Sequence, residues 1–262
     1  MGAFEGTCPD GVEIKKGIWY VMPEYTEYDK LFIISRYMMN TKQKTAFCLN
    51  LLIFVSVVFS TTAMLTGFNF MGGSGVLSAS NWLAFRYFTV DSNVLARLVS
   101  LLYIIYMLTP AGKKSERLSK AMYILKLAAT TGVTLTMMVT VFFLAPRSST
   151  TYWDLFMNSN LFMHLLTPLF CIITFVFFEA ADKPSFALSP AGVIPMVLYA
   201  SFYIPNIFLH LENGKTSYNY DWYGFLFAGV NTIWIVVPLI LLLTWVFAIC
   251  LWGFNRLCNP KR

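Results

Sequence analysis

The chain has 262 residues, of which 57% are hydrophobic, 17% aromatic and only 12% charged. An ordinary soluble domain is about 25% charged, so a water-soluble fold of this size could not cover its surface. The sequence therefore predicts an all-α, polytopic membrane protein, because each crossing of a bilayer takes roughly 20 apolar residues. The net charge of +6 is interpreted as basic loops beside the membrane, and we expect no nucleic-acid partner.

Six transmembrane helices are predicted between a polar start and a polar end. Residues 1–43 are mixed and polar, without the basic segment and apolar core of a secretory signal. We expect them to form a cytoplasmic segment, followed by a membrane domain over 44–254 and a cytoplasmic tail over 255–262. The predicted helices span 45–67, 84–108, 120–145, 156–178, 188–210 and 225–254.

The distribution of lysine and arginine predicts the orientation. Fourteen of them fall in the N-terminal segment, in the loops after the second and fourth helices and in the tail. The opposite loops contain only Arg147 and Lys215. Basic residues mark cytoplasmic loops, so both termini are predicted to be cytoplasmic. We expect an integral, multi-pass protein of the plasma membrane or the endoplasmic reticulum.

The second predicted helix contains an unusual polar stretch, RYFTVDSNVLARL, at 86–98. At about 100° per residue, Arg86, Thr89, Asn93 and Arg97 fall within an arc of about 80°, while Asp91 points to the other side. Polar stripes in a membrane helix face the interior of the bundle or a wet cavity. The stripe is therefore predicted to face inward.

The fourth predicted helix carries a second polar stripe, which includes Asn160 and His164 within an arc of about 60°. Counted from the start of their helices, Thr89, His164 and Asn231 lie within a few ångströms of one level, at about 1.5 Å per residue. A neutral imidazole beside a hydroxyl can act as a general base and turn that hydroxyl into a nucleophile. Purely structural roles are the alternatives to catalysis. His164 could form a hydrogen bond with Asn93 or Thr89, and the Thr89 hydroxyl could bond to its own helix backbone.

Two further basic residues fall inside predicted helices. Arg97 is expected near mid-bilayer, with a carbonyl, a water or a lipid headgroup as its partner, and it could bind a carboxylate or phosphate or act as a structural clamp. Lys126 is expected to extend its ammonium to the inner interface. None of the five cysteines belongs to a CxxC pair, so the sequence predicts neither a metal site nor a cofactor.

Three segments resemble a known family: FRYFTVDSNVLARLVSLLY at 85–103, NSNLFMHLLTPLFCIITFVFFE at 158–179 and YDWYGFL at 220–226. They are similar to the androgen-induced-gene and androgen-dependent TFPI-regulating protein superfamily of six-helix membrane proteins, and most similar to its bacterial and protist-like branch. The animal members are threonine hydrolases that cleave fatty-acid esters of hydroxy fatty acids. The resemblance implies that Thr89 is the nucleophile and His164 the second essential residue.

Two functions therefore remain open from the sequence. The first is an intramembrane hydrolase of lipid esters that acts through an acyl-threonine at Thr89, with Arg86, Asn93, Arg97, Asn160 and Asn231 as candidate substrate-binding residues. The second is a binding or transport protein for a lipid or small anion that uses the same polar cavity. A weaker third possibility is a structural subunit with no accessible cavity. The expected partner is a membrane lipid or a fatty-acyl ester.

Overall fold

The structure is a computed structural model, which describes residues 39–72, 81–148, 151–182 and 184–260 together with two short strands. It divides into two units, Met1–Met38 and Met39–Arg262. In the first unit, strands β1 (Glu13–Lys15) and β2 (Ile18–Tyr20) pair in antiparallel fashion. The rest of that unit, which forms most of the predicted N-terminal segment, lies outside the described residues.

The described residues of the second unit include six helices that are long and apolar enough to cross a membrane. This confirms the six predicted spans and fits an integral, multi-pass membrane protein. The spans run over Thr41–Thr66, Phe88–Leu108, Lys120–Arg147, Ser159–Phe178, Phe186–Leu209 and Val230–Cys258.

Within and between these spans the described chain forms α-helices, 3-10 helices and π-helices. The α-helices are α2 (Thr41–Thr66), α3 (Phe88–Leu108), α4 (Pro110–Lys114), α5 (Lys120–Val139), α6 (Ser159–Leu161), α7 (Thr167–Ile173), α8 (Ile194–Leu209) and α9 (Ile233–Cys258). The 3-10 turns are η1 (Asn81–Arg86), η3 (Ala145–Arg147), η4 (Tyr152–Phe156), η7 (Phe186–Val193) and η8 (Val230–Thr232). The π turns are η2 (Thr140–Leu144), η5 (Phe162–Leu166) and η6 (Thr174–Phe178).

The first span begins four residues earlier than the sequence predicted. Asn40 and Gln43 form a reciprocal capping box, in which each side chain accepts from the other residue's backbone amide. Two backbone donors at the helix start are thereby satisfied, so the polar turn after Asn40 joins the helix. At the other end, Gly67 adopts a left-handed conformation with φ of 70°, which glycine tolerates without strain and which stops the helix.

The last span differs from its prediction at both ends. The residues from 225 to 229 form turns instead of helix, and α9 continues to Cys258, past the predicted end at 254. Near its C-terminal end Asn255 is buried, and its amide donates to the carbonyls of Phe175 and Glu179. These bonds tie the helix end to the fourth span, which explains why the helix extends further than its apolar run alone indicates.

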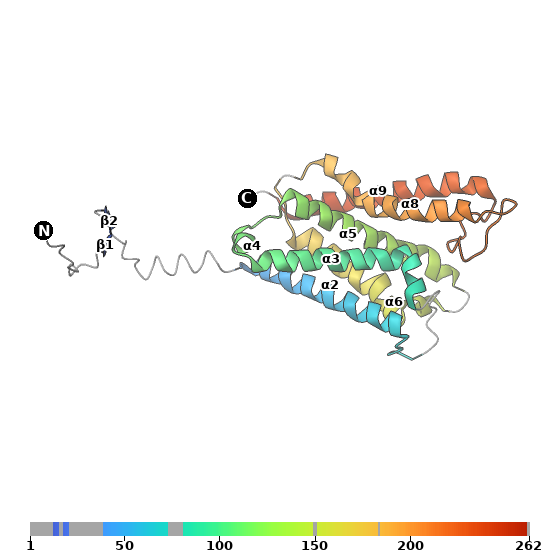
Figure 1. Cartoon of the computed structure of the whole chain (residues 1–262), viewed down its shortest axis with the longest axis horizontal. Helices are drawn as coiled ribbons and strands as arrows, with labels where there is room; N and C mark the ends of the chain where they lie inside the picture. Colours follow the sequence, from blue (N-terminus) through green and yellow to red (C-terminus); the bar gives the residue numbers. More distant parts are fainter. Residues whose placement is uncertain are drawn as a thin grey trace. The chain divides into compact units, whose positions relative to one another are not determined.

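The long helices pack side by side with α5 at the centre (Figure 1). The third span has the largest buried share of its apolar window, at 67%, whereas the fifth and sixth spans have only 17%. The helix α3 packs mainly between α2 and α5. The outer surface of α8 and α9 presents large apolar side chains such as Val197 and Leu239. An all-round apolar helix surface of this kind is stable only in contact with lipid or another protein.

Candidate functional site

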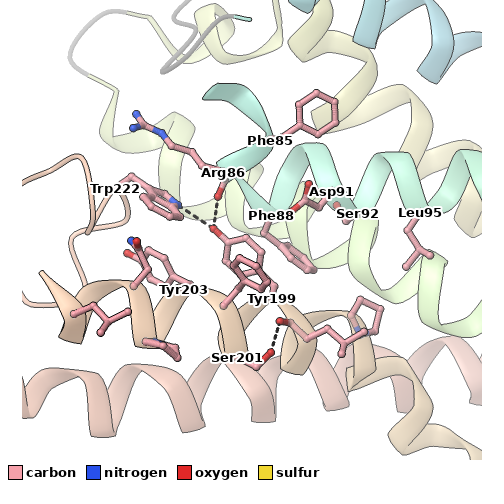
Figure 2. A pocket seen from close by; sticks show the side chains of 16 residues that line it. Phe85, Arg86, Phe88, Asp91, Ser92, Leu95, Tyr199, Ser201, Tyr203 and Trp222 are labelled. Atoms are coloured by element: carbon pink, nitrogen blue, oxygen red, sulfur yellow. Dashed lines mark hydrogen bonds between the residues drawn. The ribbon is translucent and has the colours of Figure 1, made fainter. Parts of the chain in front are cut away.

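A groove of about 870 Å³ lies between α3 and α8, and we call it the α3–α8 groove. Figure 2 shows its two walls, with Asp91, Ser92 and Leu95 on α3 and Tyr199, Ser201 and Tyr203 on α8. Most of the lining is apolar. The polar side chains that reach it include Arg86, Asp91, Ser92, Tyr199, Ser201 and Asn206. A largely apolar cavity with a few placed polar groups is the usual form of a small-molecule site.

The face that α3 turns toward α8 follows from helical spacing. Phe88, Asp91, Ser92 and Leu95 stand at positions i, i+3, i+4 and i+7, so they share one side of the helix and all line the groove. Asp91 was predicted to point away from the inward stripe, and it does lie on a different face. That face is the wall of the groove, because α8 packs beside it.

The end of the groove next to η1 holds Arg86 among aromatic rings. Its guanidinium carbon lies 5.1 Å from the ring centre of Tyr87, 5.6 Å from that of Tyr218 and 5.7 Å from that of Trp222. These contacts are cation–π interactions, and we call this group the Arg86 cage. One terminal nitrogen donates to the Tyr87 hydroxyl at 3.0 Å. The buried Nε has no hydrogen-bond partner among the described residues.

Tyr218, one of the tyrosines of the Arg86 cage, favours its neutral form. The hydroxyls of Tyr87 and Tyr218 lie 3.3 Å apart. That hydrogen bond, together with partial burial, raises the pKa of Tyr218, although the positive charge of Arg86 acts in the opposite direction. The rings therefore surround the guanidinium, and the ion pairs of the described residues do not include Arg86.

Tyr199 fixes the backbone of Arg86 to the opposite wall. Its hydroxyl donates to the Arg86 carbonyl at 2.5 Å and accepts from the Trp222 indole nitrogen at 2.9 Å (Figure 2). One side chain of α8 thus joins η1 and the loop that follows α8. This arrangement places the Arg86 cage at the end of the groove by direct hydrogen bonds.

Asp221 organises the loop that carries the aromatic rings. Its carboxylate accepts from the Tyr203 hydroxyl at 2.5 Å and from the backbone amides of Phe225 and Leu226 at 2.8 and 2.9 Å. Three donors converge on one buried carboxylate, and hydrogen bonds to charged groups are the strong ones. The sequence predicted that the sixth helix would begin at 225, whereas the carboxylate holds the backbone of Phe225 and Leu226 in a turn.

Thr89 lines a second, smaller cavity of about 240 Å³, which we call the Thr89 cavity. Side chains of α3, α5, α8 and α9 surround it, including Thr136 and Tyr199, together with Tyr223 from the loop that follows α8. Phe88, Tyr199 and Tyr203 line both this cavity and the α3–α8 groove, so the two lie on either side of the same aromatic wall. The described lining of the Thr89 cavity contains no histidine and no carboxylate, and His164 is not part of it.

His164 lies in the π turn η5, and its Nδ1 is 2.8 Å from the Leu155 carbonyl. A carbonyl can only accept, so in the neutral imidazole Nδ1 carries the hydrogen and Nε2 is the acceptor. The sequence offered Asn93 or Thr89 as structural partners for this histidine. Within the described part of the chain, the recorded hydrogen bond goes to Leu155 instead.

Asn93 joins α3 to the fourth span, next to His164. Its amide donates to the carbonyls of Thr89 at 2.8 Å and Met163 at 3.1 Å. The Met163 carbonyl is available because the Thr167 amide bonds to Phe162 in the π turn, and Pro168 has no amide to offer. The neighbouring helix supplies the missing donor, as expected for proline in a membrane helix. Asn93 thus acts here as a bridge between helices.

The other predicted binding residues do not gather in the α3–α8 groove or the Thr89 cavity. Arg97 is half-buried on α3 and makes no hydrogen bond or ion pair within the described chain. Asn160 is buried in α6, and Asn231 is exposed in η8. None of the three lines either cavity. Of the predicted binding residues, Arg86 alone reaches the groove.

A second polar cluster lies toward the other end of the bundle. The ammonium of Lys126 pairs with the Glu179 carboxylate at 2.7 Å and also donates to the Asn50 side chain. Asn50 in turn donates to Glu179 at 2.8 Å. Lys126 is only 4% exposed, so the prediction that it reaches the interface is wrong. A buried carboxylate holds it inside, and an intramembrane charge paired in this way needs no contact with water.

Sequence reasoning passed over three residues that the structure brings into these sites. Glu179 ends the uncharged run of the fourth helix, just as Lys126 precedes that of the third. Two opposite charges at the same end of neighbouring spans were a signal that they could pair. Asp91 was identified but given no role, and Tyr199 had no signal that separated it from the many other aromatic residues.

Comparisons with protein-family models, with curated proteins and with solved structures found no match for this chain. Among the described residues, no group of three or more histidine, cysteine, aspartate or glutamate side chains is placed to hold a metal ion.

Proposed function

We propose that the protein binds an amphiphile with an anionic group, which inserts its apolar part in the α3–α8 groove. The observation that carries this proposal is Arg86. Arg86 lines one end of a largely apolar groove, and the buried Nε of its guanidinium has no described hydrogen-bond partner. Arginine is well suited to carboxylates and phosphates, since its planar group offers several donors at once. The apolar walls suit an acyl chain.

Both termini are proposed to be cytoplasmic, in the plasma membrane or the endoplasmic reticulum. The basic residues of the N-terminal segment, of the loop around α4 and of the tail favour this orientation. The Arg86 cage then lies toward the outer, or lumenal, side. A lipid of that leaflet could enter the groove sideways from the bilayer.

The binding proposal is tested with the purified, full-length protein in detergent by native mass spectrometry. A long-chain fatty acid and the alcohol of equal length are added separately. Arg86→Gln is expected to lower the affinity for the acid by about tenfold or more, because it removes a charge-assisted hydrogen bond, and to leave the alcohol unaffected. Equal affinity of the variant and the original protein for the acid would contradict the proposal.

Arg147→Gln is the matched control. Arg147 is an exposed arginine in η3, at the same end of the bundle as Arg86 by the alternation of the spans, and its guanidinium donates to the Phe143 carbonyl at 3.2 Å. It does not line the groove. The control variant should bind the acid as the original protein does, so that a change in overall charge is separated from a lost contact.

The second candidate function is the hydrolysis of lipid esters, such as fatty-acid esters of hydroxy fatty acids, by Thr89 and His164. The observation in its favour is the hydrogen bond of Nδ1 to Leu155, which leaves Nε2 as an acceptor. In that reaction Nε2 would take the proton of the Thr89 hydroxyl, whose oxygen attacks the ester carbonyl and releases the alcohol. Water would then release the acid from the acyl-threonine. This requires His164 and Thr89 to approach each other.

The hydrolase candidate is tested by ester turnover with Thr89→Ala and His164→Ala. Loss of turnover in both variants supports it, and unchanged turnover in both rejects it. Thr136→Ala is the matched control, since Thr136 lines the same cavity and its hydroxyl lies 3.2 Å from that of Ser92. Turnover that falls equally in all three variants would indicate a disturbed cavity instead of a lost nucleophile.

A further inference from the structure

The carboxylate of Asp91 has no partner in the part of the chain that the structure describes. It lines the α3–α8 groove from the first turn of α3, and it makes neither a hydrogen bond nor an ion pair there. The helix dipole favours an acid at this position, but by only about 0.3–1 kcal/mol. Asp91 is half-buried in the wall of the groove, and partial removal of a carboxylate from water also has a cost. Its carboxylate is therefore open to a donor that a ligand in the groove supplies.

The polar neighbours of Asp91 in the groove direct their recorded hydrogen bonds elsewhere. The hydroxyl of Ser92 donates to the Thr89 carbonyl, and that of Ser201 donates to the Leu198 carbonyl. The Tyr199 hydroxyl donates to the Arg86 carbonyl, and the Asn206 amide donates to the Tyr220 carbonyl. The Asp91 carboxylate is thus a hydrogen-bond acceptor in the wall of the groove, and none of these four neighbours is recorded as its donor.

The same groove is therefore lined by one cationic and one anionic residue. Arg86 stands in the Arg86 cage at the end next to η1, and Asp91 lies five residues further along the chain, within the wall of α3. The two do not pair with each other, since the ion pairs of the described residues do not include either. Opposite charges held apart in one site complement a ligand that carries both charges.

We propose that the amphiphile in the groove has a zwitterionic headgroup, in which the anion binds Arg86 and a primary ammonium binds Asp91. This inference rests on the proposed binding function and specifies its ligand class. A primary ammonium has three N–H donors, whereas a trimethylated ammonium has none to give to the carboxylate. The groove should therefore distinguish two lipids that differ only in methylation of the amine.

The test uses the full-length protein in detergent and two lipids with identical acyl chains, one with a phosphoethanolamine headgroup and one with its N-trimethylated form. Affinities are measured by native mass spectrometry. The original protein is expected to favour the primary amine by about tenfold, the size of one hydrogen bond to a charged group. Asp91→Asn is expected to abolish this preference and to bind the trimethylated lipid as the original protein does, which also shows that the variant is folded.

The outcomes separate this inference from the function on which it rests. If both lipids bind equally to the original protein but more weakly to Arg86→Gln, the binding function stands and the assignment of Asp91 is overturned. If Arg86→Gln changes neither affinity, the binding function itself fails. Glu212→Gln is the matched control, because Glu212 is an acid outside the groove. A preference that Asp91→Asn leaves intact, or that Glu212→Gln removes equally, also contradicts the proposal.

Discussion

The Lys126 ammonium lies 2.7 Å from the Glu179 carboxylate, and their side chains are 5% and 1% exposed. Such a pair contributes little net stability compared with apolar residues, but the loss of one partner leaves a buried, uncompensated charge. Lys126→Met should therefore lower the free energy of unfolding by about 3–5 kcal/mol, whereas the double variant Lys126→Met/Glu179→Gln should recover most of that loss. Thermal unfolding in detergent measures the difference.

Lys44→Met is the control for the buried pair, because Lys44 is an exposed lysine near the start of α2. It should unfold at nearly the temperature of the original protein. The interpretation of Lys126 and Glu179 is wrong if the single variant also unfolds there, or if the double variant is no more stable than the single one.

Two glycines should respond in opposite directions to alanine. A Cβ on Gly192 would lie 2.5 Å from the Ala248 Cβ and 2.8 Å from the Thr131 hydroxyl, whereas a Cβ on Gly253 meets nothing within 4 Å. Gly192→Ala should destabilise by about 1–3 kcal/mol, since η7 must move away from α5 and α9. Gly253→Ala should stabilise α9 by roughly 0.5–1 kcal/mol. The midpoint temperature of thermal unfolding should be lower than that of the original protein for Gly192→Ala and higher for Gly253→Ala. A Gly192→Ala variant as stable as the original protein would contradict this packing.

Asp221→Asn should loosen the loop that carries the aromatic rings. The substituted side chain would have one carbonyl oxygen for three donors, and its amide nitrogen would face backbone N–H groups. The expected cost is about 1.5–3 kcal/mol for each lost bond to the charged group, together with a shift in tryptophan fluorescence near Trp222. Asp182→Asn is the control, because Asp182 is 78% exposed and forms a surface ion pair, which contributes about 0–1 kcal/mol. Equal effects of both variants would refute the role of Asp221.

Alkaline pH should unfold the protein partly through Tyr223. Its side chain is 37% exposed, but its hydroxyl points inward and accepts from the Phe88 amide at 2.9 Å. Desolvation, reinforced by Tyr199, raises the pKa of Tyr223 well above its ordinary value. Because the folded state holds the proton more tightly, its contribution to stability is present below the ordinary tyrosine pKa of about 10 and declines as the pH rises above it.

Ultraviolet absorbance of tyrosinate tests this behaviour alongside circular dichroism. The original protein and Tyr223→Phe should show the same absorbance change while the helices remain folded. Their absorbance changes should differ, by the amount of one tyrosinate, only when the helices unfold. A difference between them in the folded range would mean that Tyr223 ionises freely.

The six spans followed from hydropathy alone, because crossing a bilayer constrains both length and composition of a helix. The contacts between the spans could not be predicted from hydropathy. A uniform 100° per residue could place Asp91 on a different face from Asn93, but it could not say that α8 covers that face. The π turn at His164 also departs from the uniform rotation on which the stripe of the fourth helix was based. The partner of Lys126 was missed because Glu179 is distant in the sequence and belongs to another span.

The most direct test of the central claim is photo-crosslinking with a fatty acid that carries a diazirine midway along its chain, followed by peptide mapping. Binding in the α3–α8 groove predicts labelling of the facing walls of α3 and α8, near Leu95 and Leu198, with clear loss of label in Arg86→Gln. Labelling spread over the lipid-facing surface, equally in the original protein and in Arg86→Gln, would contradict the claim that Arg86 and this groove form a binding site.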